Sequence, residues 1–405
     1  MDVFFQELKR QLNFKRLLTY VLIAISLAGL WTWFIVGGAT EDFLQRGVYK
    51  EYKGRSAIEE AGKDRVGAEG EMTLDKFQSG CDIFLKSLKG DNDRDVVITK
   101  DLLKYTVYAD QLINQELRLR RMRGESAEGF MHIPRGAGMN FYENEDLFYR
   151  KYIEKNALNE NEKTLSIALL DKVKKPYTYY TGFNQWDDGI SHMMFFSFVL
   201  MVMLGIFSSS IITNDKENGM DEIITTTVNG RKSLTIAKIS IPLIMASIIY
   251  LCGVGLYVLL LKYLLPADAL NTSIQVSSRS FLPYTQGDLL RNVFIVGWIG
   301  ILIVSSFSTW ISSISKKSSK AIQFSILTIL GSFILGVSIT SHSRNMDIIK
   351  MIIPGGIGFS YVQSIDFPFI TILGKTLWMP SILIIASSII FLLSTIFTTL
   401  NYRRR

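Results

Sequence analysis

Six apolar segments of about 20 residues dominate the sequence, and none of them contains Asp, Glu, Lys, Arg or His. An α-helix of that length rises about 30 Å, which matches the hydrocarbon thickness of a bilayer. The sequence therefore predicts six membrane-spanning helices in a chain of 405 residues. The predicted spans are residues 17–36, 193–212, 239–261, 293–314, 321–339 and 380–400.

Residues 38–190 form a polar insert between the first two spans, long enough to bury a core of its own. Its pattern is mainly helical: apolar residues from Leu102 to Leu117 recur every three or four positions behind Thr99, a predicted N-cap. Further helices are predicted near residues 145–158 and 162–174. We therefore predict an all-α membrane protein with a mainly α-helical domain inserted between spans 1 and 2.

Basic residues near the span ends predict the orientation of the chain. They lie before the first span, in the second and fourth connections between spans, and after the last span. With six spans, these four segments, including both termini, are on the same side of the membrane. The positive-inside rule assigns this side to the cytoplasm, which predicts that the insert is extracytoplasmic. The residues are Lys9, Arg10, Lys15, Arg16, Lys216, Arg231, Lys232, Lys238, Lys316, Lys317, Lys320, Arg403, Arg404 and Arg405.

Three predicted regions follow from these segments. Residues 1–37 hold an amphipathic start, either a cytoplasmic interfacial helix or a simple basic flank, and the first span. Residues 38–190 form the insert, and residues 191–405 hold the other five spans. Within the last region, residues 348–372 are apolar but broken by Pro and Gly, which favours a re-entrant or interfacial segment, or else packing beneath the insert.

The absence of ionisable residues from the six windows disfavours ion-coupled transporters and intramembrane hydrolases, which need such groups at depth. The small and hydroxyl residues there serve either helix packing or a weakly polar translocation wall. Cys81 and Cys252 do not suggest a disulfide framework, and the three histidines lack the spacing of a zinc site. Basic residues that flank spans, rather than forming a stripe with aromatics, disfavour nucleic-acid binding. We expect no enzymatic site and no metal in this chain.

One apparent phosphate-binding motif ends at Gly374, Lys375 and Thr376, but Phe369 stands where the first Gly of the motif belongs. The segment is also expected outside the cell, where ATP is not available to it. We therefore expect no cofactor in this chain. The energy to move a substrate against its concentration gradient would come from another polypeptide.

Residues 214–238, between spans 2 and 3, are dense in charge of both signs. Residues 219–227 place Met220, Ile223, Ile224 and Thr227 on one face of a short predicted helix, which Asn229-Gly230 ends. Such a helix, parallel to the membrane, suits contact with a soluble motor domain. An interfacial helix without a partner explains the pattern equally well.

At these residues the chain resembles the type-2 ABC transporter permeases, which have six spans, cytoplasmic termini and a coupling helix between spans 2 and 3. The family pattern of Glu, Gly, an aliphatic pair, a turn, Arg and Lys is matched, whereas Val228 and Ala237 stand where many members have Pro and Gly. The matching residues are Glu217, Gly219, Ile223, Ile224, Asn229, Gly230, Arg231 and Lys238.

The resemblance implies the permease subunit of an exporter for a peptide such as a bacteriocin or antimicrobial peptide, a lipid or a drug. The partners that it implies are membrane lipids, a second permease copy or a paralogue, and two cytoplasmic ATPase subunits. ATP and Mg would bind to those ATPase subunits. The alternative is a mechanotransmitter or sensor whose extracellular insert is moved by such an ATPase. In either case the implied ATPase-coupling residues are Glu217, Gly219, Met220, Ile223, Ile224, Thr227, Arg231 and Lys238.

Overall fold

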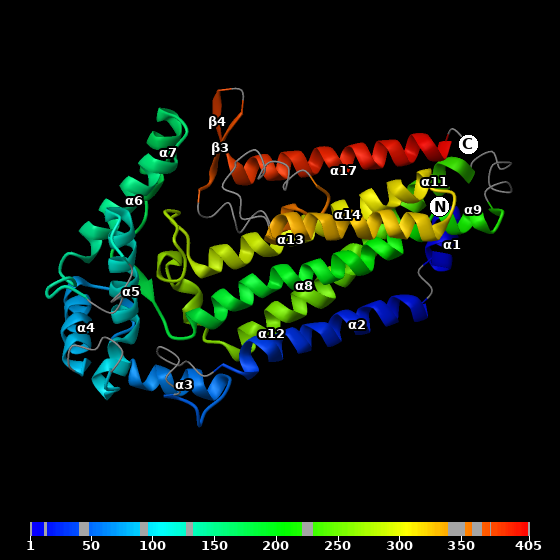
Figure 1. Cartoon of the computed structure of the whole chain (residues 1–405). Helices are drawn as coiled ribbons and strands as arrows, with labels where there is room; N and C mark the ends of the chain where they lie inside the picture. Colours follow the sequence, from blue (N-terminus) through cyan, green and yellow to red (C-terminus); the bar gives the residue numbers. More distant parts are fainter. Residues whose placement is uncertain are drawn as a thin grey trace.

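The computed structural model of the chain is a bundle of long helices with a smaller helical domain at one end (Figure 1). Both chain termini lie at the opposite end of the bundle. The described residues are 2–11, 14–39, 48–89, 96–126, 133–220, 230–338, 353–358, 367–372 and 374–403.

The six predicted spans are confirmed, since six helices among the described residues are long and apolar enough to cross a membrane. They run side by side in Figure 1. The first is α2 (Phe14–Thr32) with the π-helical turn η1 (Trp33–Gly37), and the third joins α11 (Gly230–Tyr250), the π-helical η2 (Leu251–Gly255) and α12 (Leu256–Leu264). The others are α8 (Phe183–Ser210), α13 (Gln286–Ile314), α14 (Ser318–Ser338) and α17 (Met379–Arg403).

Helix α8 begins ten residues before the predicted window, after Gly182 at a φ of 90°. Asp187, Asp188 and His192 therefore belong to the helix that forms the second span. Hydropathy does not detect this extension, because a helix continues as long as its backbone hydrogen bonds are made, whether or not its side chains are apolar.

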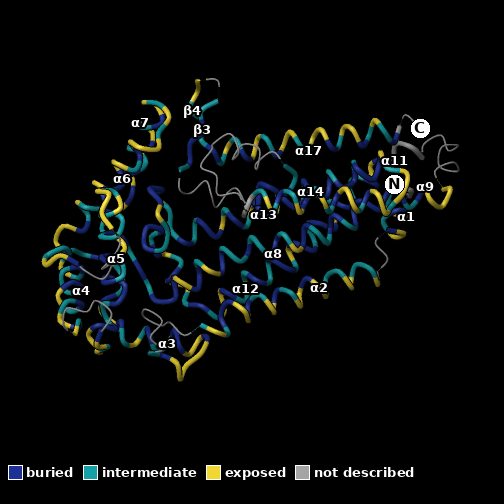
Figure 2. The backbone as a smooth tube through the Cα atoms, viewed as in Figure 1, coloured by how far each residue is buried: buried dark blue, intermediate teal, exposed yellow. Residues whose placement is uncertain are grey.

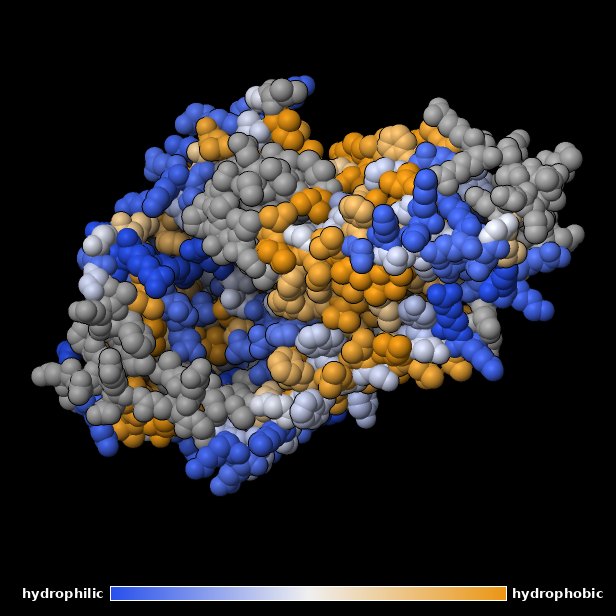
Figure 3. Space-filling model, turned by 45° about the vertical axis from the view of Figure 1, so that its right-hand side comes forward, coloured by the Kyte–Doolittle hydropathy of each residue, from blue (hydrophilic) through white to orange (hydrophobic). Residues whose placement is uncertain are grey.

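Helices α8 and α13 form the centre of the bundle. In their most apolar windows 67% and 61% of residues are buried, against 22% to 28% for the first, fifth and sixth spans. The peripheral spans thus expose apolar side chains, as lipid contact requires (Figure 2). Figure 3 shows hydrophobic atoms over the middle of the bundle, with hydrophilic atoms over the insert and near the termini.

Small residues let the central helices approach closely. A Cβ atom on Gly205 of α8 would lie 2.5 Å from Cδ1 of Ile329 on α14. Ser208 Oγ and Ser305 Oγ, on α8 and α13, lie 2.7 Å apart and are both fully buried. These serines therefore let the two helices pack against each other. Their hydroxyl groups hydrogen-bond to each other, which lipid chains could not do.

The insert is mainly helical, as predicted. Thr99 caps the longest helix by accepting a hydrogen bond from the Leu102 backbone N–H at 3.2 Å, and Gly124 ends it at a φ of 75°. Phe77 and Phe141 stack in the core with ring centroids 3.7 Å apart. The elements are α3 (Arg55–Asp64), β1 (Gly70–Glu71), α4 (Leu74–Ser87), α5 (Lys100–Arg123), α6 (Phe141–Asn156), α7 (Glu160–Leu170) and β2 (Thr178–Tyr179), the two strands pairing antiparallel.

The end of the predicted re-entrant segment 348–372 is a strand. β3 (Phe369–Ile372) pairs antiparallel with β4 (Lys375–Trp378) around Gly374, while residues 348–352 and 359–366 lie outside the described residues. Lys375 and Thr376 thus lie on a strand and not at a helix N-terminus, where a phosphate-binding loop would place them. The hairpin contacts the insert: the Thr371 hydroxyl donates to Glu162 of α7 at 2.7 Å.

Two short 3-10 helices complete the connection between the third and fourth spans. They are η3 (Ala267–Asn271) and η4 (Ile274–Val276). Thr285 then starts α13 with a capping box, because its side chain accepts from the Asp288 N–H while Asp288 accepts from the Thr285 N–H. This connection lies against the insert, since the Ser273 N–H donates to the Thr178 carbonyl at 2.9 Å.

Candidate functional site

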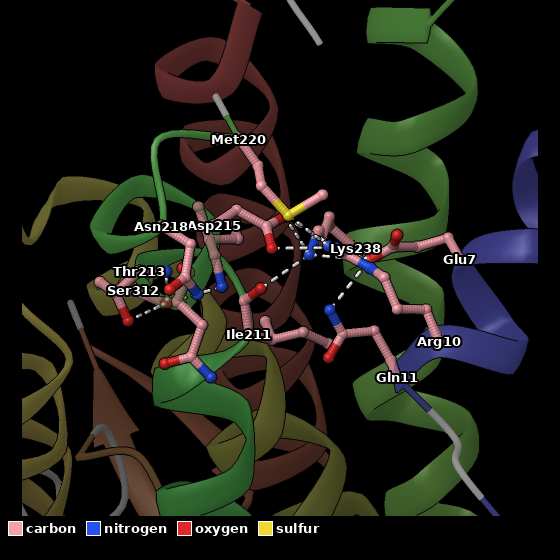
Figure 4. A network of polar contacts seen from close by, with 12 residues as sticks. Glu7, Arg10, Gln11, Ile211, Thr213, Asp215, Asn218, Met220, Lys238 and Ser312 are labelled. Carbon is pink, nitrogen blue, oxygen red and sulfur yellow. Dashed lines mark hydrogen bonds and ion pairs between the residues drawn. The ribbon is translucent and has the colours of Figure 1, made fainter. Parts of the chain in front are cut away.

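The connection between spans 2 and 3 begins in a cluster of four charged side chains at the terminal end of the bundle, three of which are buried (Figure 4). We call Glu7, Arg10, Asp215 and Lys238 the polar junction. They come from three elements: α1 (Asp2–Gln11), α9 (Thr213–Glu217) and α11. The junction therefore ties the N-terminal helix to both sides of the segment at residues 214–238.

Lys238 is at the centre of the polar junction and is 0% exposed. Its Nζ lies 2.8 Å from Glu7 Oε1 and 2.5 Å from Asp215 Oδ2, and it donates to the Ile211 carbonyl at 2.8 Å. A lysine ammonium carries three N–H donors, so these three oxygens satisfy it completely. A charge this deeply buried is tolerable only with such complete pairing.

Arg10 connects α1 to the same carboxylates. Its Nη2 lies 2.7 Å from Glu7 Oε1 and 2.9 Å from Asp215 Oδ1, and its Nη1 donates to Met220 Sδ at 3.2 Å. Gln11 adds a hydrogen bond to Glu7 at 3.0 Å. Two cations thus face two carboxylates, and a movement of residues 215–220 must move α1 or break these bonds.

A second set of contacts ties α9 to the connection between α13 and α14. Lys216 donates to the carbonyls of Ser312, Ser313 and Ser315 at 2.6 to 3.3 Å, at the C-terminal end of α13, where a helix dipole favours a cation. Glu217 accepts the Ser318 N–H at 2.9 Å, at the start of α14. Helix α9 is therefore held against three spans.

The electrostatics of Glu7 follow from this arrangement. Burial alone would raise the pKa of Glu7, but the Arg10 hydrogen bond and the charge of Lys238 lower it below its ordinary value. A carboxyl whose pKa is lowered on folding stabilises the folded state above its unfolded pKa, and this stability is lost as pH falls through the folded pKa. The junction should therefore weaken below about pH 4.

A Glu7→Gln variant tests this linkage. We expect it to be less stable than the parent at pH 7 by about 1.5–3 kcal/mol, the usual contribution of a hydrogen bond to a charged group. The difference should shrink as pH falls, because Glu7 of the parent is then protonated as well. Thermal unfolding in detergent at pH 7 and at about pH 3 measures both values. A difference that is the same at both pH values would contradict the linkage.

The structure places only some of the residues predicted to couple to an ATPase. Gly219 has a φ of 67° just after α9, and Met220 is 38% exposed. Ile223, Ile224 and Thr227 lie outside the described residues. The backbone of Arg231 belongs to α11, but its side chain is not described.

Lys238 is more than a basic residue at the end of a span. Its side chain is enclosed by its own chain and paired with Glu7 and Asp215. Glu217 likewise caps α14 within the chain. Both residues hold the segment to its own chain, but only Lys238 is buried, whereas Glu217 and Met220 are exposed.

Sequence reasoning missed Glu7, Arg10 and Asp215 as members of one site. One signal was present: Glu7 and Arg10 are three residues apart on an amphipathic helix and so share a face. The other was an acidic residue, Asp215, directly after an apolar span. Neither signal shows that Arg10 pairs with Asp215, which is 205 residues away in the chain.

Comparison with known families agrees with this architecture. The model of the ABC-2 family transporter proteins matches residues 66–400 of the chain. The chain therefore belongs to this family and is a type-2 ABC transporter permease, a multi-pass membrane protein. A search of curated proteins finds no significant match to the chain.

Proposed function

We propose that this chain is the permease subunit of an exporter that moves a peptide, a lipid or a drug-like molecule out of a bacterial cell. ATP and Mg would bind to two separate cytoplasmic ATPase subunits, and a second permease copy or a paralogue would complete the complex. The polar junction is the observation that carries this proposal, because it joins the connection after span 2 to α1 and α11.

The polar junction suits the transmission of force. Helix α9 is bonded to α13 and α14 through Lys216 and Glu217, and to α1 and α11 through Asp215. A push by an ATPase on residues 219–227 would then reach several spans at once instead of bending a loose loop. This requires the terminal end of the bundle to face the cytoplasm, in agreement with the basic residues there.

A second function, the mechanotransmitter, has one specific observation in its favour. The insert is bonded to the chain just before the last span, since Asn159 donates to Thr371 at 2.9 Å and Thr371 donates to Glu162. Movement of α17 would therefore also move α7, which would let the spans act on a ligand of the insert. ATP-dependent movement of a substrate into vesicles would exclude this alternative.

An Ile223→Asp variant tests the contact with an ATPase. A carboxylate on the predicted apolar face would have to be desolvated in the interface, so we expect ATP turnover by the purified complex to fall about tenfold, or the complex to dissociate. The chain would be purified together with its proposed ATPase partner, and ATP turnover of the complex would be measured. The matched control is Leu158→Asp, at an exposed position of the insert, which should change nothing. Unchanged assembly and turnover for Ile223→Asp would remove the assigned role.

A further inference from the structure

A cavity of about 540 Å³ lies where the insert meets the membrane bundle. Its walls come from both parts: α5 of the insert contributes Asp110 and Asn114, and the first turns of α8 contribute Gln185 and Asp187. Arg65, which follows α3, and Ser277, which follows η4, complete the polar lining. The volume is within the range of about 300–1,000 Å³ that is usual for small-molecule sites.

Asp110 of α5 places a carboxyl group in the lining of the cavity. Within the described part of the chain it makes no hydrogen bond or ion pair, although it lines the cavity. Burial raises the pKa of Asp110 to about 7, and the charge of Arg65 only partly opposes this. Asp110 is partly exposed to the cavity, so a ligand there can reach it, and a carboxyl group with a raised pKa in a cleft is a candidate for a functional site.

Asp187 faces the same cavity in a fixed orientation. Its Oδ1 accepts from the Ser277 hydroxyl at 3.0 Å and from Gln286 Nε2 at 3.2 Å. Gln185, which is 8% exposed, has a buried Oε1 with no hydrogen-bond partner among the described residues. The lining thus offers two carboxylates and an amide oxygen, all of them acceptors.

We propose that this cavity binds the ammonium group of an amine-bearing ligand, with Asp110, Asp187 and Gln185 as its acceptors. Above about pH 7, where Asp110 is ionised, two carboxylates outnumber the single guanidinium of Arg65, so the lining favours a cation over an anion. The three donors of a primary ammonium match the three acceptors. Because Asp110 lies on the insert and Asp187 on the second span, the ligand would hold the two parts together. The proposal depends on neither an ATPase partner nor transport.

The amine could belong to a small molecule or to a peptide, and the experiment separates the two. The purified full-length chain in lipid nanodiscs is titrated calorimetrically with lysinamide and, separately, with the tripeptide Gly-Lys-Gly. The fully acetylated form of each serves as the uncharged control. Binding of lysinamide alone identifies a small amine, and binding of the tripeptide alone identifies a peptide. No difference between either amine and its acetylated form would overturn the proposal.

Variants assign the acceptors. We expect Asp110→Asn and Asp187→Asn each to weaken binding at least tenfold, and the double variant to abolish it, whereas Asp82→Asn at an exposed site of the insert leaves it unchanged. Asp110→Asn keeps the shape of the side chain and breaks no hydrogen bond of the described residues, so its thermal unfolding should match that of the parent at pH 6. Binding by the double variant as tight as that of the parent would overturn the proposal.

The pH dependence provides an independent measurement. Asp110 should lose its charge as pH falls below about 7, so the affinity for the amine should decrease between pH 8 and pH 6. Among the described residues, the other charged groups of the cavity are Arg65 and Asp187, from the α3 end and from α8. The Asp110→Asn variant should lack this dependence. A parent affinity that does not change over this range would contradict the role of Asp110.

Discussion

Replacing Lys238 by Met should destabilise the protein by about 3–5 kcal/mol, the usual cost of removing one partner from a buried ion pair. Methionine fills nearly the same volume but carries no charge. It would leave Glu7 and Asp215, which are almost fully buried, with only Arg10 to compensate their two charges. The apparent unfolding temperature of the purified chain in detergent measures the loss.

The same span supplies a matched control. Lys262 is exposed at the opposite end of the third span, so Lys262→Met should change stability by no more than about 0.5 kcal/mol. A second test is the double variant Lys238→Met, Asp215→Asn, which leaves Glu7 paired with Arg10 and should recover about half of the loss. Equal effects of Lys238→Met and Lys262→Met would show that the junction does not stabilise the fold.

The spans and the helices of the insert could be predicted because their signals are local. The window 17–36 lies within the observed Lys15–Gly37, and Thr99 is the cap that the sequence indicated. The predicted helices at 145–158 and 162–174 correspond to α6 and α7, shifted by two to four residues. Apolar periodicity and capping residues depend only on near neighbours, so one sequence contains them.

The polar junction could not be predicted, because its pairs join residues far apart in the chain. Lys238 and Arg10 both look like ordinary basic flanks of spans, and the positive-inside rule explains each of them without a partner. Only the folded bundle shows that Asp215 neutralises both. The coupling role of residues 221–229 stays a prediction, since they lie outside the described residues.

The hairpin at residues 369–378 was not predicted, although its signal is present in the sequence. Ile370, Thr371 and Ile372 are β-branched, and Gly374 stands before a second short run with Thr376 and Trp378. Such runs around a Gly indicate a hairpin. The apolar character of the whole region favours a re-entrant segment, and this signal is stronger than the local strand propensity.

Replacing Gly138 by Ala should destabilise the insert by about 3 kcal/mol, the upper part of the usual range for overpacking a core. Gly138 is buried before α6, and a Cβ atom there would lie 2.5 Å from the Gln78 Cα and 2.5 Å from the Phe77 carbonyl carbon. These are backbone atoms of α4, so no side-chain rotation relieves the clash. Helix α4 would have to shift, and with it the stacked pair of Phe77 and Phe141.

The control for this prediction is Gly62→Ala in α3. A Cβ atom at Gly62 meets nothing within 4 Å, and Ala favours a helix over Gly by about 1 kcal/mol, so this variant should be as stable as the parent or slightly more so. Limited proteolysis of the full chain in nanodiscs, with cleavage sites in the insert followed over time, compares the two. Equal protection of both variants would mean that α4 lies farther from Gly138 than the structure places it. Because α4 packs on α5, which carries Asp110, a shifted α4 should also weaken amine binding in Gly138→Ala and leave it intact in Gly62→Ala.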